Sequence, residues 1–409
     1  MRGILAAYIA ALVTLAGLAA GGGLAVYDAM GPSDPVEAAA ADHGYNVLAW
    51  EIRHAPGKWL YKVGGLFGDH SPDDPDTVLR RYFDLTGQIR EKERDAASAP
   101  AAAALRSERD GLQNALEDII EGRVTQLLKD QGLVMGPPPF TDMDIVFPPV
   151  DFEPDQPPRV LVTSPRSRIE LDRSYLLSPG FGLETVTAIE HNAEAADAGV
   201  SALVVNTGGV ATYPSVVSDM DSYESLIDTV IHEWLHQYLS FFPLGRSYYS
   251  GNETRTLNES VASIGGHELA RLYFERYGNL APAPSATPSP SPTPAPSGSA
   301  GTFDFAAEMR ALRRQVEDLL IAGKIDEAER LMAQKRDEFE AHGVYIRRLN
   351  QAYFAFHGSY ADTPASIDPI GPKLQTLLDK AGSAGEFVRL AARVTTRAEL
   401  DALLARLGG

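Results

Sequence analysis

The chain contains no cysteine at any of its 409 positions. This absence excludes disulfide bonds and thiolate ligands, so any metal site must be built from histidine and carboxylate side chains. Positive charge is also scarce, because 36 Lys and Arg residues stand against 55 Asp and Glu residues, and the formal net charge is −19. No basic tract is available to neutralise phosphates, which argues against nucleic acid as a partner.

Hydrophobic residues are present in ordinary amounts and make up 44% of the chain. Over this length, such a fraction supports one large domain or two domains with cores of their own. The acidity favours solubility and makes tight binding to anionic lipid unfavourable.

The main candidate metal ligands and catalytic residues lie in the segment T-V-I-H-E-W-L-H-Q-Y at residues 229–238, which contains an H-E-x-x-H array. His232 and His236 are four residues apart, so a helix places both imidazoles on one face, where they can bind a single metal ion. Glu233 lies beside them and can reach a water molecule at that ion. This pattern predicts a metal-dependent hydrolytic site.

The residues around this array predict a buried helix. The neighbouring positions are uncharged, as expected for a helix that packs behind a metal site. Asp221 and Glu224 are predicted to cap the helix at its N terminus, and Pro243 is predicted to end it. Asp228, one turn before His232, is either a partner for the second ring nitrogen of that histidine or an ordinary polar position.

A third candidate ligand, Glu259, lies in the later stretch L-N-E-S-V-A-S-I-G-G, on the next predicted helix after His236. Two alternatives stay open for this stretch. Glu259 follows Thr256 by three residues and is also placed to act as its partner in a capping box. His267 and Glu268 are rival ligands, but they lie two to three helical turns further along the chain, so Glu259 is preferred.

An H-E-x-x-H array followed at this distance by N-E-x-x-A resembles the gluzincin zinc metallopeptidases, in which a glutamate completes the metal site. Residues 258–265 are more narrowly similar to the N-E-S-x-A stretch of a bacterial family described as zinc aminopeptidases. The resemblance implies one zinc ion held by His232, His236 and Glu259, with Glu233 as the general base. Ser263 stands where thermolysin-type enzymes carry an acidic residue, so the groups around the ligands must differ from that branch.

An oxyanion-stabilising residue is also implied by this resemblance, since gluzincins usually supply a late tyrosine or histidine for that role. Asn350, Tyr353, His357 and Tyr360 are spaced so that they lie on one side of a helix and of the loop after it. The G-S-Y stretch that ends at Tyr360 is similar to a G-T-Y stretch of the aminopeptidase-like family. Tyr360 is therefore the first candidate and His357 the second, and an aromatic stripe of the core is the alternative.

The first 28 residues form an apolar run whose only charges are at Arg2 and Asp28. The run is long enough to cross a bilayer as a helix, and its flanking charges place the rest of the chain outside the cytoplasm. It is predicted to be an uncleaved single-pass anchor in the cell membrane, with a cleaved signal peptide and secretion as the alternative.

The remaining chain divides by composition into four parts. Residues 29–135 are predicted to form a helical juxtamembrane region that includes an antiparallel helical hairpin. Residues 136–370 are assigned to the metallopeptidase domain, interrupted at 281–301 by a Pro-rich spacer predicted to be disordered. Residues 371–409 are predicted to be a helical tail. The expected fold class is α+β, predominantly α-helical, with a gluzincin-like domain built on one small sheet.

Within the predicted metallopeptidase domain, turn residues separate short β-type runs from helical segments. Strands are predicted at 144–147, 159–163, 201–206 and 210–217, with Thr207-Gly-Gly turning between the last two, and helices at 183–198, 257–277, 303–322 and 325–341. In gluzincins an edge strand before the motif helix pairs with the extended substrate. By that resemblance, residues 209–217 are the candidate substrate-binding strand, and Pro214 favours an edge position; an ordinary core strand is the alternative.

Together these features predict a membrane-anchored, zinc-dependent peptidase that acts on a peptide or protein substrate. The choice between aminopeptidase and endopeptidase stays open, because residues 208–213 lack the acidic residue that aminopeptidase gluzincins often use to hold a substrate amine. The alternative is a catalytically inactive, membrane-tethered binding or scaffold protein with a degenerate site.

Overall fold

The computed structural model describes residues 34–47, 49–51, 53–54, 74–94, 99–139, 142–280, 303–361 and 363–408. The anchor predicted for residues 1–28 and the spacer predicted for 281–301 lie outside the described residues. Among the helices that the structure describes, none combines the length and the apolar character needed to span a bilayer.

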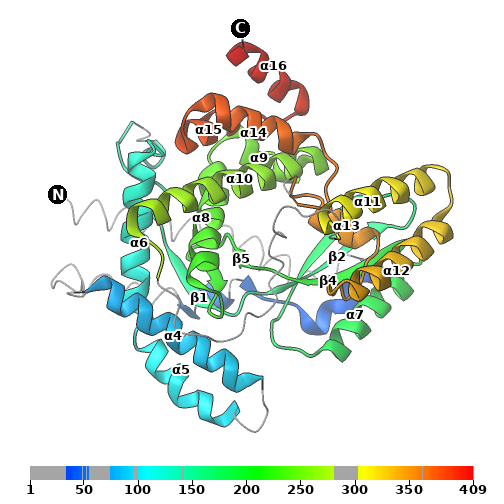
Figure 1. The fold of residues 1–409 in the computed structure, drawn as a ribbon, viewed down its shortest axis with the longest axis horizontal. Coiled ribbons are helices and arrows are strands. Elements are labelled where there is room, and N and C mark those ends of the chain that lie inside the picture. The colour runs from blue at the N-terminus through cyan, green and yellow to red at the C-terminus, as the bar shows by residue number, and fades with distance from the viewer. Residues whose placement is uncertain are drawn as a thin grey trace.

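Helices make up most of the described chain, and the strands form two separate three-stranded sheets (Figure 1). The α+β class with helical predominance is therefore confirmed, but the single small sheet that we expected is divided into two. The first sheet has the order β3 (Arg173–Leu177), β2 (Arg159–Pro165), β4 (Val200–Asn206) and is antiparallel throughout. The second has the order β1 (Phe152–Asp155), β6 (Ser215–Ser218), β5 (Gly209–Val210).

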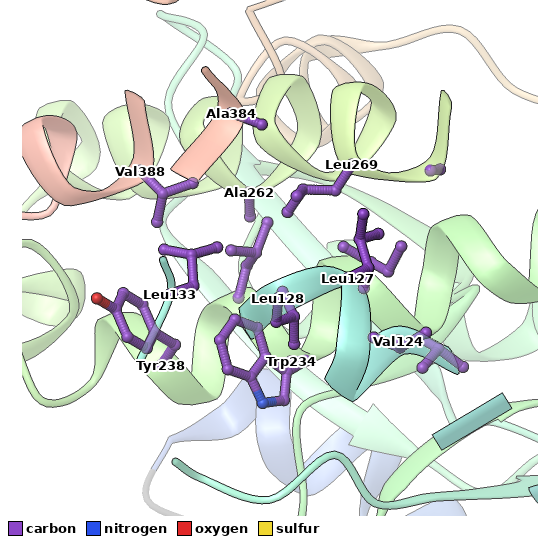
Figure 2. Close-up of a cluster of buried hydrophobic side chains, with 14 of the residues drawn as sticks. Val124, Leu127, Leu128, Leu133, Trp234, Tyr238, Ala262, Leu269, Ala384 and Val388 are labelled. Atoms are coloured by element: carbon purple, nitrogen blue, oxygen red, sulfur yellow. The ribbon is translucent and has the colours of Figure 1, made fainter. Parts of the chain in front are cut away.

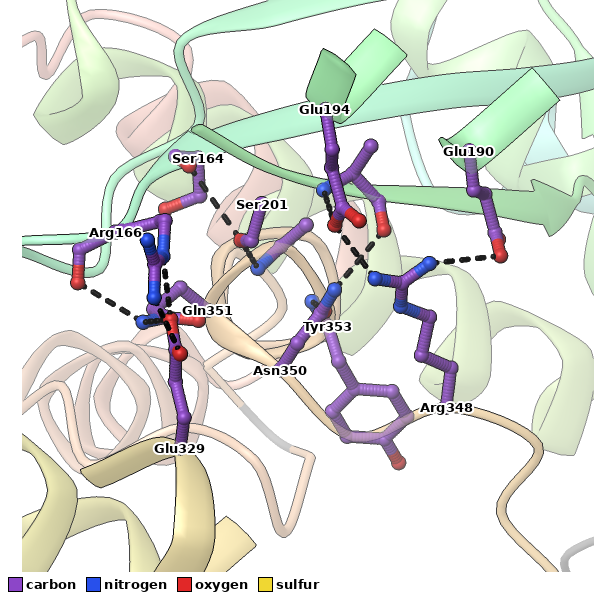
Figure 3. Close-up of polar contacts among 12 residues, drawn as sticks. Ser164, Arg166, Glu190, Glu194, Ser201, Glu329, Arg348, Asn350, Gln351 and Tyr353 are labelled. Atoms are coloured by element: carbon purple, nitrogen blue, oxygen red, sulfur yellow. Dashed lines mark hydrogen bonds and ion pairs between the residues drawn. The ribbon is translucent and has the colours of Figure 1, made fainter. Parts of the chain in front are cut away.

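Helices cover both faces of the first sheet, as the alternation along its strands requires. Ala202 and Val204 of β4 face α7 (Leu183–Ala196) and α2 (Pro35–Ala40). Leu203 and Val205 point the other way and pack with Ala352 of α13 (Gln351–His357). Polar side chains fix these contacts, since Asn350 at the start of α13 donates a hydrogen bond to Ala202 O at 2.9 Å (Figure 3).

The strand predicted at 210–217 is broken in two in the structure. Strands β5 and β6 form an antiparallel hairpin, with residues 211–214 as its turn, and β6 pairs in parallel with β1. Strand β5 therefore lies at the edge of the sheet. The Thr207-Gly-Gly segment does not turn one strand back onto its neighbour, because β4 pairs with β2 and the chain passes from one sheet to the other.

The main hydrophobic core surrounds two long helices, α8 (Tyr223–Leu239) and α10 (Asn252–Tyr277). Trp234 of α8 is 1% exposed, and its indole N–H donates to Pro148 O at 2.8 Å. Figure 2 shows this side chain among leucine and valine side chains from α6 (Gln113–Asp130) and α10. The core holds α8 rigidly, because its apolar face is enclosed on several sides.

The predicted hairpin is present, although its second arm is interrupted. Helix α4 (Pro75–Glu93) packs against α5 (Ala102–Asp110) and α6. Residues of α4 and α6 belong to the same core as α8 and α10, and so do those of the C-terminal helices α14 (Ile370–Ala381), α15 (Ala384–Ala391) and α16 (Arg397–Gly408). Both predicted flanking regions therefore support the helices that carry the H-E-x-x-H array and Glu259.

A smaller core lies under the predicted helical pair after the spacer. Helices α11 (Phe305–Ile321) and α12 (Ile325–Ala341) form this pair, as predicted, and Gly323 joins them with a φ of +74° that suits glycine. The strand predicted at 144–147 is wrong. This segment is irregular and is followed directly by Pro148 and Pro149, which cannot donate hydrogen bonds to a strand ladder.

The starts of both long helices differ from the prediction. Helix α8 begins after Ser222, whose hydroxyl accepts a hydrogen bond from Ser225 N at 3.2 Å, so the predicted Asp221–Glu224 capping pair is wrong. Helix α10 begins at Asn252, earlier than the predicted position 257, and ends at Tyr277 as predicted. Since Thr256 lies inside α10, the capping-box alternative for Glu259 is also wrong.

Candidate metal centre

The side chains of helix α8 face two environments, the core on one side and a cavity on the other. Trp234 and Leu235 are buried in the main core, whereas His232, Glu233 and His236 line a cavity of about 1250 Å³. This division follows from the helical period, because residues at positions i and i+4 lie on the same face. The predicted helical presentation of the H-E-x-x-H array is present in the structure.

Helix α10 lies against α8 and brings Glu259 to the two histidines. The two helices are in van der Waals contact here, because a Cβ added to Gly266 of α10 would lie 3.7 Å from His232 Cα. The side chain of Glu259 is 9% exposed, so its carboxylate is held away from bulk water. The structure therefore places all three predicted ligands in one cluster.

The ligand atoms of the cluster lie within 4.8 Å of one another, close enough to share one metal ion. His232 Nε2 and His236 Nε2 are 3.0 Å apart, and Glu259 Oε2 lies 3.8 Å from the first and 3.4 Å from the second. Ligands at about 2.0–2.2 Å from a tetrahedral ion are separated from one another by about 3.3–3.6 Å. One divalent ion of the size of zinc fits between these three atoms, and the histidine–carboxylate donor set is one that zinc accepts.

Two neighbouring side chains orient the ligands. Asn258 Oδ1 lies 2.7 Å from His236 Nδ1, so this ring nitrogen donates its proton to the amide and Nε2 is left to face the cluster. Tyr248 donates a hydrogen bond from its hydroxyl to Glu259 Oε1 at 2.5 Å, which leaves Oε2 directed toward the histidines. Neither residue was singled out from the sequence. Asn258 had a signal, the N-E pair itself, but Tyr248 stands in a connecting segment without a recognisable pattern.

The charges of the cluster perturb its ionisation. Burial lowers the pKa of His232 to about 4. Burial acts in the same direction on His236, but the Glu259 carboxylate outweighs it and raises the pKa of His236 to about 9. For Glu259, burial likewise opposes the charged form, but the contact with His236 outweighs burial and lowers the pKa of Glu259 to about 2. At neutral pH Glu259 is therefore a carboxylate and His232 is neutral, as metal ligands must be, whereas His236 must release a proton when a metal ion binds.

Glu233 differs from Glu259 in its ionisation. Burial raises the pKa of Glu233 to about 7, and the Glu259 charge adds to this effect while His236 opposes it. A carboxyl group with a pKa near neutrality can both accept and return a proton at working pH, which is the property of a general acid–base catalyst.

The edge strand β5 lies directly against Glu233. A Cβ added to Gly209 would come within 2.8 Å of Glu233 Oε1 and of Thr229 Cγ2, so the backbone at this position fits only as glycine. The side chain of Gln237 ties the following turn and β6 to α8, because its amide donates to Thr212 O and to Ser215 Oγ, the latter at 2.8 Å. The predicted strand at 209–217 thus brings the outer edge of β5, which pairs with no further strand among the described residues, to the wall of the cavity, beside Glu233.

Tyr360 and His357, the two predicted oxyanion residues, have different positions. Tyr360 lines the cavity, and its ring centroid is 6.3 Å from that of His232. Burial raises the pKa of Tyr360 well above its usual range, so its hydroxyl stays protonated and can donate a hydrogen bond. His357 packs on Tyr353 at 4.3 Å between ring centroids, burial lowers its pKa to about 4, and it does not line the cavity. The structure brings Tyr360 to the cluster but not His357.

The remaining candidates on these helices lie outside the ligand set. Asp228 is paired with His267, with 3.3 Å between Asp228 Oδ2 and His267 Nε2, instead of serving as the partner of His232. The side chain of His267 is 60% exposed. Glu268 accepts hydrogen bonds from Arg271 on the surface of α10. Both rival ligands are therefore engaged elsewhere.

Comparisons of this chain with models of known protein families, with curated proteins and with solved structures found no match.

Proposed function

We propose that this protein is a zinc-dependent peptidase of the gluzincin type, in which His232, His236 and Glu259 hold one zinc ion. The observation that carries the proposal is the convergence of three ligand atoms within 4.8 Å of one another, beside a buried glutamate and on the wall of a large cavity. The N-E motif that supplies Glu259 also supplies the amide partner of His236, which adds support to the resemblance.

When bound, a divalent cation at this position acidifies a water molecule and polarises a peptide carbonyl. Glu233 accepts a proton from the attacking water and returns it to the departing amine, and its raised pKa suits both steps. Tyr360 donates a hydrogen bond from its protonated hydroxyl to the oxygen of the reacting carbonyl.

The substrate backbone pairs with the free edge of β5 in this proposal. An extended peptide that adds a strand to an open sheet edge satisfies its own N–H and C=O groups. The absence of a side chain at Gly209 lets the backbone of β5 lie against Glu233. A peptide paired with β5 then has the bond to be cleaved beside the general base.

The apolar run at residues 1–28 adds a proposed location, with the catalytic domain outside the cytoplasm and tethered by one helix. Alkaline carbonate extraction of membranes tests this part separately: the full chain stays in the pellet if the run is an anchor, and it is released if the run is cleaved or absent from the bilayer.

The experiment that tests the activity is cleavage of a peptide library by the full chain, with and without a chelator. The proposal predicts cleavage that a chelator abolishes and that stoichiometric zinc restores. A protein that binds one zinc ion per chain and cleaves nothing would support the binding or scaffold alternative instead. Cleavage that persists in a metal-stripped protein would refute a metal-dependent mechanism.

A further inference from the structure

One guanidinium lies in the lining of the cavity that contains the candidate ligands. Arg255 is on α10 one turn before Glu259, so both side chains extend from the same face of the helix. The other charged groups of this lining are carboxylates or histidines; the carboxylates are Glu37, Asp228, Glu233 and Glu259. Among the described residues of this lining, Arg255 is therefore the one Lys or Arg side chain beside several carboxylates.

The contacts of Arg255 within the described part of the chain are with neutral groups. Its Nη1 donates to Asn252 Oδ1 at 3.2 Å, and its guanidinium carbon lies 5.7 Å from the ring centroid of Tyr248. Arg109 and Arg348, which are also largely shielded from solvent, each form an ion pair with a carboxylate. Among the described residues we find no ion pair between Arg255 and a carboxylate, so its fork of donors is available to a ligand.

Tyr248 fixes the distance between this cation and the metal cluster. The guanidinium of Arg255 lies over its ring, and its hydroxyl bonds to Glu259, so a single aromatic side chain separates the two. An extended peptide advances about 3.3–3.6 Å per residue. These contacts place a substrate carboxylate bound by Arg255 on a group within about three residues of the bond at the metal cluster.

The cavity continues past Arg255. A second cavity of about 380 Å³ shares Leu171, Arg255 and Ser359 with the first, so Arg255 stands at the junction of the two. Phe354 and Ile367 give the second cavity apolar surface. This space can receive the side chain of a residue whose carboxylate is held at the junction.

We propose that Arg255 binds a carboxylate of the substrate, located within about three residues of the cleaved bond. Two sources present this chemistry: the C-terminal carboxylate of a peptide, which would make the enzyme remove a few terminal residues, and the side chain of Asp or Glu. A guanidinium binds either carboxylate through two parallel hydrogen bonds. The inference rests on the proposed peptidase function and adds a substrate class to it.

The test compares three mixtures of N-acetylated hexapeptides whose sequence is randomised over residues other than Asp and Glu. The first has a free C-terminal carboxylate, the second is C-terminally amidated, and the third is amidated with Glu fixed at the last position. The readout is the ratio of kcat/KM for each carboxylate-bearing mixture to that for the neutral amide. We expect the wild type to prefer one of them by about 10- to 100-fold, the range of a hydrogen bond to a charged group.

Three variants assign the preference to its residue. Arg255→Gln should bring the ratio close to one through a higher KM, and Arg255→Lys should restore part of it. Arg276→Gln is the matched control, because Arg276 is on the same helix but pairs with Asp130 on the surface; it should keep the wild-type ratio. Zinc content and thermal stability of Arg255→Gln, compared with the wild type, show whether the fold is retained.

A wild type that cleaves all three mixtures equally, or an Arg255→Gln variant that keeps the preference, would overturn the inference and leave the peptidase proposal intact. If no mixture is cleaved, the peptidase proposal fails, and binding then decides the inference. Calorimetric titration of the Glu233→Gln protein with the free-acid and amidated mixtures should show tighter binding of the acid, lost on adding Arg255→Gln. Equal binding would overturn the role of Arg255.

Discussion

Two of the polar clusters in which the protein buries carboxylates differ in how their charges are balanced. In the first, which we call the Glu190 network, Glu190 is 1% exposed and accepts hydrogen bonds from Val204 N at 2.7 Å and from Arg348 Nη1 at 3.2 Å (Figure 3). Arg347 adds a second guanidinium to the same carboxylate. Each charge in this network has a fixed partner, and the network joins α7 and β4 to the segment before α13.

The second cluster comprises His232, Glu233, His236 and Glu259. Among the described residues, no lysine or arginine forms an ion pair with either of its carboxylates, and its four side chains line a cavity. In the Glu190 network, fixed cations neutralise the buried carboxylate, so the contacts serve to hold the fold together. Ligand atoms that converge without such cations, and that retain access to a cavity, support the metal ion and substrate that we propose.

The largest effect is expected at Glu233. Replacing it with Gln keeps the shape of the side chain but removes the group that accepts the proton, so peptide hydrolysis should fall by about 10²- to 10⁴-fold. Zinc content should stay at the wild-type value, because Glu233 is not one of the three ligands. Initial rates and metal analysis on the same preparation measure both. Undiminished turnover in this variant would remove Glu233 from the mechanism.

Tyr360 and His357 form the next pair. Tyr360→Phe removes a donor from the cavity and should lower kcat by about 10²- to 10³-fold. His357→Asn changes a side chain that packs on Tyr353 outside the cavity, so kcat should stay within about threefold of the wild type. The opposite ranking of the two variants would mean that the cavity lining does not identify the oxyanion donor.

Glu190 should give a stability effect without a catalytic one. Glu190→Gln weakens three hydrogen bonds with guanidinium groups in a buried position and should lower the free energy of unfolding by about 2–3 kcal/mol. Zinc affinity and kcat per folded molecule should not change. The control is Glu275→Gln, which breaks a surface pair with Arg271 and should cost less than about 0.5 kcal/mol. Loss of zinc from Glu190→Gln would mean that the two clusters are coupled.

Alanine substitutions at two asparagines test the two clusters separately. Asn258→Ala removes the partner of His236 and should weaken zinc binding by about 10- to 100-fold, with little change in stability. Asn350→Ala removes the N-terminal cap of α13 and should cost about 1 kcal/mol of stability, with zinc affinity unchanged. Competitive zinc titration and chemical denaturation of both variants give the four values. A zinc defect in Asn350→Ala instead of Asn258→Ala would invalidate the assignment.

The smallest effect concerns Asp221, a partly buried acid outside both clusters. Burial raises the pKa of Asp221 to about 6, against a hydrogen bond with Ser218 that lowers it. The folded state therefore holds this proton more tightly than the unfolded chain does, and stability decreases as the pH rises from about 4 to about 6. Asp221→Asn should stabilise the protein by about 1–2 kcal/mol at pH 7.5 and by nothing at pH 4. A gain that is the same at both pH values would contradict the titration.

The sequence alone was enough to predict the centre of the site and parts of the fold. The i, i+4 spacing of His232 and His236 requires one helical face, and the N-E pair marks Glu259, so local pattern determined these positions. Tyr248 could not be predicted in the same way, because its role depends on how a connecting segment folds back onto α10. The arrangement of the sheets could not be predicted either, because it depends on strand pairing between distant segments. The β-type run at 210–217 gives no local sign that it divides into β5 and β6, since β6 pairs with β1 from a distant part of the chain.

The most direct test is a crystal of the zinc-soaked protein, measured with X-rays on both sides of the zinc absorption edge. We predict a single anomalous peak at about 2.0–2.2 Å from His232 Nε2, His236 Nε2 and Glu259 Oε2. A peak at another position, or no peak at these three atoms in the presence of zinc, would contradict the assignment of the metal centre and with it the proposed function.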